Sequence, residues 1–358
     1  MFEIKELSAE ERRQLIDTRQ VHEGWEARRA LLEGRFAGGM RWSSRNGREY
    51  LLRKRSRSER SLGPRSPETE AIHAQFMAGR ERAQADAAAL QARLERMAPL
   101  NVALGLGRVP RLTARLIRRL RDAGLLGRHI HVVGTNALFA YESRAGVRVA
   151  SGLLATGDAD LLLDARRRLR LALEDARREG VLGLIRKVDA SFEPRAPGDF
   201  RAINRDGYMV DLIRPQTRRV LEPGDPDRVG SAGEDLRGAP IQGLDWLVNA
   251  PKFSALALDE AGFPVVIDTV DPRAFALHKA WLAALPDRDP VKRPRDRAQA
   301  LAATAIATRY LGLSFDDPAL SALPRALRDV APSLLAPAAA AGDPPPDATP
   351  PDGRPDWW

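Results

Sequence analysis

The sequence contains no cysteine in 358 residues, and this absence removes several kinds of chemistry at once. Disulfide bonds, zinc sites with thiolate ligands, iron–sulfur clusters and cysteine nucleophiles are all excluded. Histidine is scarce as well: the five histidines form no close HxxxH-type pair, and the nearest two are His129 and His131. A metal site built on sulfur or on clustered histidines is therefore not expected.

Long apolar runs are also missing. No stretch approaches the roughly 18 consecutive apolar residues that a membrane-spanning helix needs. The opening residues, MFEIKELSAEERRQL, are too acidic and too interrupted for a signal peptide. We therefore predict a cytoplasmic protein with no membrane partner.

Charged residues, in contrast, are plentiful and have a net positive sign. Lys and Arg number 57 against 48 Asp and Glu, which gives +9, and 44% hydrophobic residues are enough to build a core. This composition excludes wholesale disorder. The positive excess favours anionic partners such as nucleotides, RNA or phosphorylated metabolites. A high-GC genome would raise the arginine content in the same way without any function, so composition leaves both explanations open.

The length predicts about two domains with a small appendage, and changes in texture divide the chain into four regions. Residues 1–99 are a helical N-terminal region with a basic hairpin at Asn46-Gly47, the strongest short turn signal. Residues 100–223 alternate short strands and helices, which indicates an α/β or α+β core with a mixed sheet. Residues 224–334 start with a Gly-, Asp- and Pro-rich loop and continue as a hairpin plus helices, and residues 335–358 are a Pro- and Ala-rich tail expected to be disordered.

Within the core, five segments have the composition of strands. In chain order they are HIHVV, GDADLLLD, VLGLIRKVDASFEP, FRAIN and YMVDLIRP. The last two are joined across Asp206-Gly207, which predicts a hairpin. The charged segment ARRRLRLALEDARREG after the second strand predicts a helix.

Three pieces of this core carry candidate chemistry. The first strand ends in Gly134-Thr135-Asn136, where glycine permits close approach to a phosphate, the hydroxyl donates to it, and a helix start favours anions. Asp158 and Asp160 stand at i and i+2 of a strand, so both carboxylates project from one face and repel unless a cation lies between them. Asp211 lies inside an apolar strand, where a lone aspartate is costly unless it is paired or bound to metal.

Gly134-Thr135, Asp158-Ala159-Asp160 and Asp211 together resemble the active site of the polymerase-β-like nucleotidyltransferase superfamily. The wider stretches SLGPRSPETEAI, VVGTNALFAYE, ATGDADLLLD and DGYMVDLIRP resemble a stand-alone bacterial nucleotidyltransferase-fold family whose members mostly lack an assigned substrate. The resemblance covers about residues 40–310. The interval from Thr135 to Asp158 is longer than is usual in the superfamily, and an inserted strand such as GVRVASG is expected to fill it.

The resemblance implies a Mg²⁺-dependent enzyme that moves a nucleotidyl group from an NTP to an acceptor hydroxyl and releases pyrophosphate. In the superfamily the first two aspartates hold divalent ions around the triphosphate, and the third completes a metal site and helps to activate the acceptor. Carried over, Asp158, Asp160 and Asp211 would be catalytic residues and ligands of two Mg²⁺ ions, with Mn²⁺ as an alternative. The acceptor class is left open between RNA, protein and a small molecule. This chemistry needs charge neutralisation and in-line positioning more than a covalent nucleophile.

The resemblance also implies that a helical lysine and a later basic-Asp element lie near the triphosphate. Lys279 is then a candidate nucleotide ligand beside Gly134, Thr135 and Asn136, and Asp296 a candidate to orient it. For Lys279, the competing interpretation is a solvated position on an amphipathic helix. For Asn136, the competing interpretation is a helix N-cap. The alternative for the whole chain is a catalytically inactive module of the same fold that binds nucleic acid or a partner protein.

Other polar residues are interpreted as structural. Lys187 and Arg201 flank the strand region and are assigned to the surface, although contact with phosphate is a second interpretation. His129 and His131 have no carboxylate at useful spacing, and Asp164 is a helix cap. The basic stretch 41–65, with Trp42 and Tyr50, permits two interpretations: an electrostatic track for RNA or another acidic acceptor, or a solvated hairpin edge. The second is preferred.

Overall fold

A computed structural model describes residues 3–56, 58–164, 174–216 and 234–339, with the side chains of residues 174–178 left out. The chain divides into two compact units. Unit 1 consists of the described parts of Met1–Ala9, Gly107–Glu260 and Val265–Trp358, and unit 2 of Glu10–Leu106 and Ala261–Pro264. Within the described residues, no helix combines the length and the apolar character that crossing a membrane requires.

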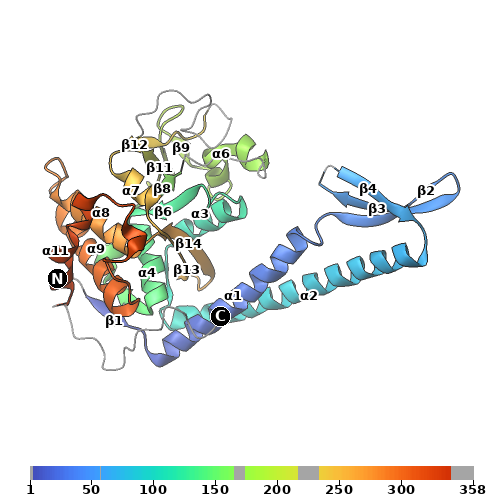
Figure 1. Cartoon of the computed structure of the whole chain (residues 1–358), viewed down its shortest axis with the longest axis horizontal. Helices are drawn as coiled ribbons and strands as arrows, with labels where there is room; N and C mark the ends of the chain where they lie inside the picture. The colour runs from blue at the N-terminus through green and yellow to red at the C-terminus, as the bar shows by residue number, and fades with distance from the viewer. Residues whose placement is uncertain (1–2, 57, 165–173, 217–233, 340–358) are drawn as a thin grey trace. The chain divides into compact units, whose positions relative to one another are not determined.

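Unit 2 is built on two long helices, α1 (Ala9–Glu33) and α2 (Pro67–Ala103), which lie side by side and are joined by a three-stranded sheet (Figure 1). The strands are β2 (Gly39–Arg45), β3 (Arg48–Arg55) and β4 (Ser58–Pro64), each antiparallel to the next. The predicted hairpin turn is confirmed, because Asn46 and Gly47 both have positive φ between β2 and β3. The third strand, β4, was not anticipated in the basic stretch.

Unit 1 is built on a six-stranded mixed sheet in the order β6-β8-β11-β10-β9, with β12 also paired to β11. The strands are β6 (Ile130–Val133), β8 (Asp158–Leu163), β9 (Glu193–Pro194), β10 (Arg201–Ile203), β11 (Met209–Pro215) and β12 (Ala239–Ile241). β8 and β11 run parallel to each other, whereas β6 is antiparallel to β8 and β10 to β11. The predicted strand that ends at Gly134, the Asp-x-Asp strand and the β10–β11 hairpin are all confirmed.

Two smaller sheets and a set of helices complete unit 1. The small sheets are β1 (Ile4–Glu6) with β7 (Val147–Val149), and β5 (Gly107–Val109) with β13 (Lys252–Asp259) and β14 (Pro264–Val270). The helices are α3 (Arg111–Asp122), η1 (Gly134–Ala137), α4 (Leu138–Ala145), α5 (Ser151–Leu154), α6 (Glu174–Arg186), α7 (Leu244–Asn249), α8 (Pro272–Ala284), α9 (Arg293–Ala305), η2 (Ile306–Tyr310), η3 (Pro318–Leu320), α10 (Arg325–Arg328) and α11 (Ala331–Ala339). β7 is the strand expected in GVRVASG; it pairs with β1 and stands outside the main sheet.

One continuous core joins the regions predicted as 100–223 and 224–334. Leu162 of β8 and Leu212 of β11 are fully buried, and they share a cluster with Tyr141 of α4 and Phe275 of α8. Because this core spans both predicted regions, the hairpin β13–β14 and the helices α8 and α9 are packed parts of the sheet's own unit.

Three sequence predictions need correction. The strand predicted from Val181 is instead helical: it is the part of α6 that follows a kink at Gly180 (φ +67°) and ends at Arg186. Only Glu193–Pro194 of that segment is a strand. Its apolar residues Val181, Leu182, Leu184 and Ile185 recur at helical spacing and are all buried. Residues 4–6, predicted as helix, are β1. Residues 335–339, placed in the disordered tail, belong to α11, where Ala338 is buried; residues 340–358 lie outside the described residues.

The candidate active site

The sheet places the three predicted aspartates on one face. β8 and β11 are hydrogen-bonded parallel neighbours, and their register sets Asp160 directly opposite Asp211. Residues opposite each other on paired strands point to the same side, and Asp158 shares that side because it precedes Asp160 by two positions. Asp211 is buried, while Asp158 and Asp160 are half-buried.

Asp160 is a carboxylate whose pKa is raised by its surroundings. Burial, followed by the negative charges of Asp158 and Asp211, raises the pKa of Asp160 to about 7. Lys279 and Arg201 act in the opposite direction and only partly offset the repulsion. At Asp160, the basic residues of the site therefore do not fully balance the negative charge.

Gly134 is required by the position of Asp160. It directly follows β6, whose last residue, Val133, pairs with Asp160, and it has φ +64°, in the left-handed region that L side chains rarely adopt. A Cβ atom at this position would meet the carboxylate oxygen Oδ2 of Asp160 at 2.1 Å. The glycine thus lets the chain turn into η1 directly against the carboxylate.

Thr135 is held by two side chains of α9. Its hydroxyl oxygen accepts hydrogen bonds from Arg295 Nη2 at 3.1 Å and from Gln299 Nε2 at 3.1 Å. A threonine hydroxyl has two acceptor lone pairs and one donor hydrogen, so these contacts leave the hydrogen available to a ligand. Gln299 also donates to the carbonyl of Leu153 at 2.8 Å, and Arg295 to that of Ala155, so the same two side chains of α9 join the Gly134 turn to the end of α5.

Asn136 links the turn to β8. Its Nδ2 donates to the carbonyl of Asp158 at 2.8 Å, whereas its Oδ1 is buried and has no hydrogen-bond partner among the described residues. The N-cap interpretation is wrong, since neither η1 nor α4 has a side-chain cap. The carboxylate of Asp158 itself accepts a short hydrogen bond from the hydroxyl of Thr156.

Arg201 forms a two-pronged ion pair with Asp211. Its Nε and Nη2 lie 2.7 Å and 2.6 Å from the two carboxylate oxygens, and β10 sets the two residues opposite each other. The surface interpretation of Arg201 is therefore wrong: 27% of its side chain is exposed, and its charge is directed at a candidate catalytic carboxylate. Lys187 does lie on the surface, where it pairs with Glu179.

Lys279 is buried on α8 and pairs with Asp296 of α9. Lys279 Nζ lies 2.8 Å from Asp296 Oδ1, and Arg288 binds the other oxygen of the same carboxylate at 2.6 Å. Because Lys279 is 9% exposed, the interpretation as a solvated surface position is wrong. Its charge is among those that lower the pKa of Asp160, so Lys279 lies within electrostatic range of the aspartates.

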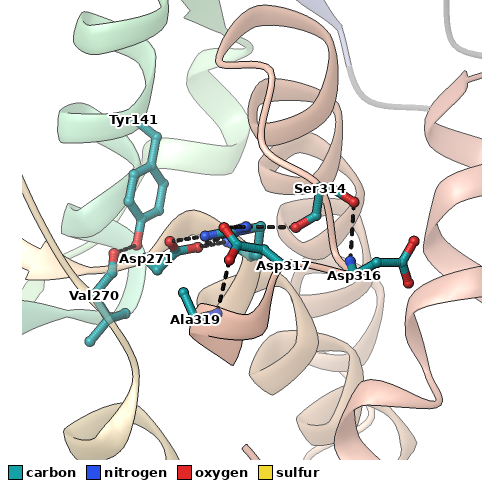
Figure 2. Close-up of polar contacts among 8 residues, drawn as sticks. Tyr141, Val270, Asp271, Ser314, Asp316, Asp317 and Ala319 are labelled. Carbon is teal, nitrogen blue, oxygen red and sulfur yellow. Dashed lines mark hydrogen bonds and ion pairs between the residues drawn. The ribbon is translucent and has the colours of Figure 1, made fainter. Parts of the chain in front are cut away.

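The start of α8 is fixed by a polar cluster that Figure 2 shows around Asp271 and Asp317. The buried guanidinium of Arg273 binds Asp271 at 2.8 Å and Asp317 at 2.9 Å, and donates to the carbonyl of Ser314. Tyr141 of α4 donates to the carbonyl of Val270 at 2.8 Å, just ahead of the helix. These contacts hold the helix that presents Lys279.

The remaining predicted residues lie apart from this constellation. His131 is buried within β6, in line with the structural interpretation. Asp164 is buried directly after β8, and its predicted role as a helix cap concerns residues from 165 on, which lie outside the described residues. Sequence reasoning missed the roles of Thr156 and Gln299, for which the sequence carries no spacing signal.

The described residues contain no group of three or more His, Asp or Glu side chains already arranged to hold a metal ion. Both oxygens of Asp211 are engaged by Arg201 in this structure. The three aspartates therefore share a face and an electrostatic field without forming a preassembled cage.

The structure thus sets three strand aspartates of a mixed sheet beside a glycine-hydroxyl turn, which is the arrangement that the sequence resemblance led us to expect. Comparison with family models agrees, because the family described as Nucleotidyltransferase matches residues 111–324. The chain belongs to this family, which confirms the superfamily and the fold class predicted from the sequence. No curated protein and no solved structure is significantly similar to the chain.

Proposed function

We propose that this chain transfers a nucleotidyl group from a nucleoside triphosphate to an acceptor hydroxyl. The acceptor hydroxyl gives up its proton to water and its oxygen forms a bond to the α-phosphorus, while the bond to the pyrophosphate oxygen breaks and its electron pair leaves with pyrophosphate. The observation that carries the proposal is the placement of Asp158, Asp160 and Asp211 on one sheet face, against the turn at Gly134. Family membership supports nucleotidyl transfer as the general reaction.

The donor set fits Mg²⁺, with Mn²⁺ as an alternative ion. Mg²⁺ prefers oxygen ligands and is commonly bound by one or two carboxylates together with substrate phosphates. Asp158 and Asp160 are proposed as the main ligands, because the repulsion at Asp160 is what a cation would relieve. Asp211 would be the third, through the lone pairs that Arg201 leaves free. Two such ions would neutralise the triphosphate and stabilise the entering and leaving oxygens.

The chain's own residues would position the triphosphate. The hydroxyl of Thr135 has its lone pairs occupied by Arg295 and Gln299, so its hydrogen points away from both and is free to donate to a phosphate oxygen. Lys279 supplies positive charge from α8 and is oriented by Asp296. Asn136 Oδ1, buried and unpartnered among the described residues, would accept a hydrogen bond from the nucleotide or from a bound water.

The test is transfer of label from NTPs labelled at the α-phosphate. The protein would be incubated with each NTP, Mg²⁺ and cell extract, and the labelled product identified. We expect label in an acceptor together with pyrophosphate release, and loss of both on adding a chelator or on changing Asp160 to Asn. Transfer of label from the γ-phosphate instead, or no transfer from any NTP with Mg²⁺ or Mn²⁺, would contradict the proposal.

A second candidate function, a non-catalytic binding module on the same fold, is favoured by one observation. Arg201 occupies both oxygens of Asp211, as a residue that replaces a cation would. In that case the wild type would transfer no label from any NTP, and Arg201→Met would only lower stability. In the enzyme, by contrast, Arg201 and Asp211 act on the same reaction, and the variant would change the transfer rate.

A further inference from the structure

The three-stranded sheet of unit 2 carries a dense positive surface, here called the basic sheet. Its members are Arg45, Arg48, Arg53, Lys54, Arg55 and Arg60. The glutamates of the same sheet are already paired, Glu59 with Arg41 at 3.1 Å and Glu49 with Arg65 at 2.6 Å. Among the described side chains, no carboxylate forms an ion pair with the six members. Arg53 and Arg55 instead donate to backbone carbonyls. The exposed charges open to an external anion are therefore those of Arg45, Arg48, Lys54 and Arg60.

The strand register brings like charges together at two positions, whereas Lys54 lies opposite Glu59, whose carboxylate is paired with Arg41. Arg53 on β3 lies directly opposite Arg60 on β4, and Arg45 on β2 lies directly opposite Arg48 on β3. Like charges in directly opposed positions destabilise a sheet. The pKa of Arg53 is lowered, first by burial and then by the charges of Arg55, Arg60 and Arg80, which reflects the same crowding. Of the two pairs, Arg45 and Arg48 share the face of β3 that also carries Tyr50, and an anion bound between them would relieve their repulsion.

The two faces of the basic sheet differ. One face packs toward α2. Leu51 is fully buried there, Arg53 lies over the ring of Phe76 at 4.5 Å, and the ring of Trp42 contacts that of His73 of α2. The other face carries Tyr50 and Leu52, both half-buried, in line with Arg48 and Lys54 along β3.

This second face has the chemistry of a nucleic-acid platform. Proteins that bind single strands combine basic side chains along the phosphates with an aromatic ring on which bases stack. Here Tyr50 supplies the ring, and Arg45, Arg48 and Lys54 supply the charges at its sides. A partner that offered negative charge alone would make no use of Tyr50 and Leu52, which favours nucleic acid over an acidic protein.

We propose that the basic sheet binds single-stranded nucleic acid, with phosphates on Arg45, Arg48 and Lys54 and a base stacked on Tyr50. The proposal does not rest on the nucleotidyl-transfer function, because the surface lies wholly within unit 2 and the binding needs neither NTP nor metal ion.

The experiment measures binding of a fluorescent single-stranded oligouridine to the full chain by anisotropy across a range of salt concentrations. The triple variant Arg45→Gln, Arg48→Gln, Lys54→Gln is compared with a control that removes the same charge from exposed positions of α2: Arg82→Gln, Arg93→Gln, Arg96→Gln. We expect the first to bind at least ~10-fold more weakly and to reduce the salt slope by about 2, since each phosphate contact contributes about 0.7 to the slope. The control should stay within about 2-fold of the wild type.

Tyr50→Leu separates stacking from charge. We expect this variant to bind about 5- to 100-fold more weakly with an unchanged salt slope. The proposal is overturned if Tyr50→Leu binds normally, if heparin or an acidic protein competes as well as the oligonucleotide does, or if duplex of the same length binds as tightly. If both triple variants lost the same amount of affinity, binding would depend on net charge alone, and the proposal would also be overturned. The duplex and competition measurements use the wild type. They therefore test binding of single-stranded nucleic acid even if a variant misfolds.

Discussion

Asp160 on β8 lies directly opposite Asp211 on β11, and only Asp211 has an arginine bound to its carboxylate. Two carboxylates side by side on a sheet face repel, so the fold has to balance both charges. Arg201 balances Asp211, whereas Asp160 has no ion pair among the described residues and rests against the backbone of Gly134. This asymmetry identifies Asp160 as the carboxylate most in need of a cation.

Replacing Arg201 should destabilise the chain strongly. In Arg201→Met the buried carboxylate of Asp211 loses its partner, and breaking such a pair costs about 3 kcal/mol or more in free energy of unfolding. The matched control is Arg195→Met, which removes an exposed arginine from its i,i+4 pair with Asp199. Asp199 keeps its hydrogen bond from the backbone N–H of Phe200, so the change should cost less than about 1 kcal/mol. Urea denaturation measures both; similar small costs for the two variants would show that Arg201 does not hold Asp211.

Gly134→Ala should lower both the stability of the chain and its nucleotide binding, for two independent reasons. A left-handed φ costs an L residue about 1–2 kcal/mol, and the new methyl group would displace the carboxylate of Asp160. We expect loss of stability together with loss of Mg²⁺-dependent nucleotide binding. Gly152→Ala is the control, because a Cβ there meets nothing within 4 Å and Gly152 lies in α5. An active, fully stable Gly134→Ala protein would mean that the turn does not press against Asp160.

His278 should make stability depend on pH. It is buried beside Trp246 and Trp281, and burial, then the charge of Lys279, lowers its pKa to about 3. The unfolded chain protonates this histidine near about pH 6.5, so below that value the unfolded state binds more protons and is favoured. The contribution of His278 to stability is thus constant above about pH 6.5 and is lost as pH falls, by about 1.4 kcal/mol per unit.

The variant His278→Phe keeps the packing and removes the titration. Free energies of unfolding, measured between about pH 7 and about pH 5, should fall less steeply for the variant than for the wild type. Parallel curves would show that the folded chain does not lower the pKa of His278, so that the folded and unfolded states protonate it equally.

The strands that carry the aspartates could be predicted because their signals are local. An apolar run fixes each strand, and two-residue alternation then fixes the shared face of Asp158 and Asp160. The helix end at 181–186 was mistaken for a strand because a short apolar run of Val, Leu and Ile fits both structures.

The partner of Asp211 could not be predicted, because it depends on the turn. A two-residue turn across Asp206-Gly207 would align Arg201 with Leu212 and turn it to the other face. The observed turn has three residues, closed by Asn204 N–H to the carbonyl of Tyr208 at 3.0 Å, and this shifts Arg201 opposite Asp211. The contacts of Thr135 with Arg295 and Gln299 join residues 160 and 164 positions apart, for which the sequence offers no register at all.

The most direct test of the central claim is the thermal midpoint of the wild type and of Asp160→Asn, each with NTP alone, Mg²⁺ alone and both together. Binding to the folded state raises stability by about 2.7 kcal/mol at a ligand concentration 100 times Kd. We predict a large upward shift for the wild type only when NTP and Mg²⁺ are both present. Asp160→Asn should show almost no shift, yet its ligand-free midpoint should equal or exceed that of the wild type, because a repelling charge is gone. Equal shifts in the two proteins, or none in the wild type with every NTP, would contradict the account.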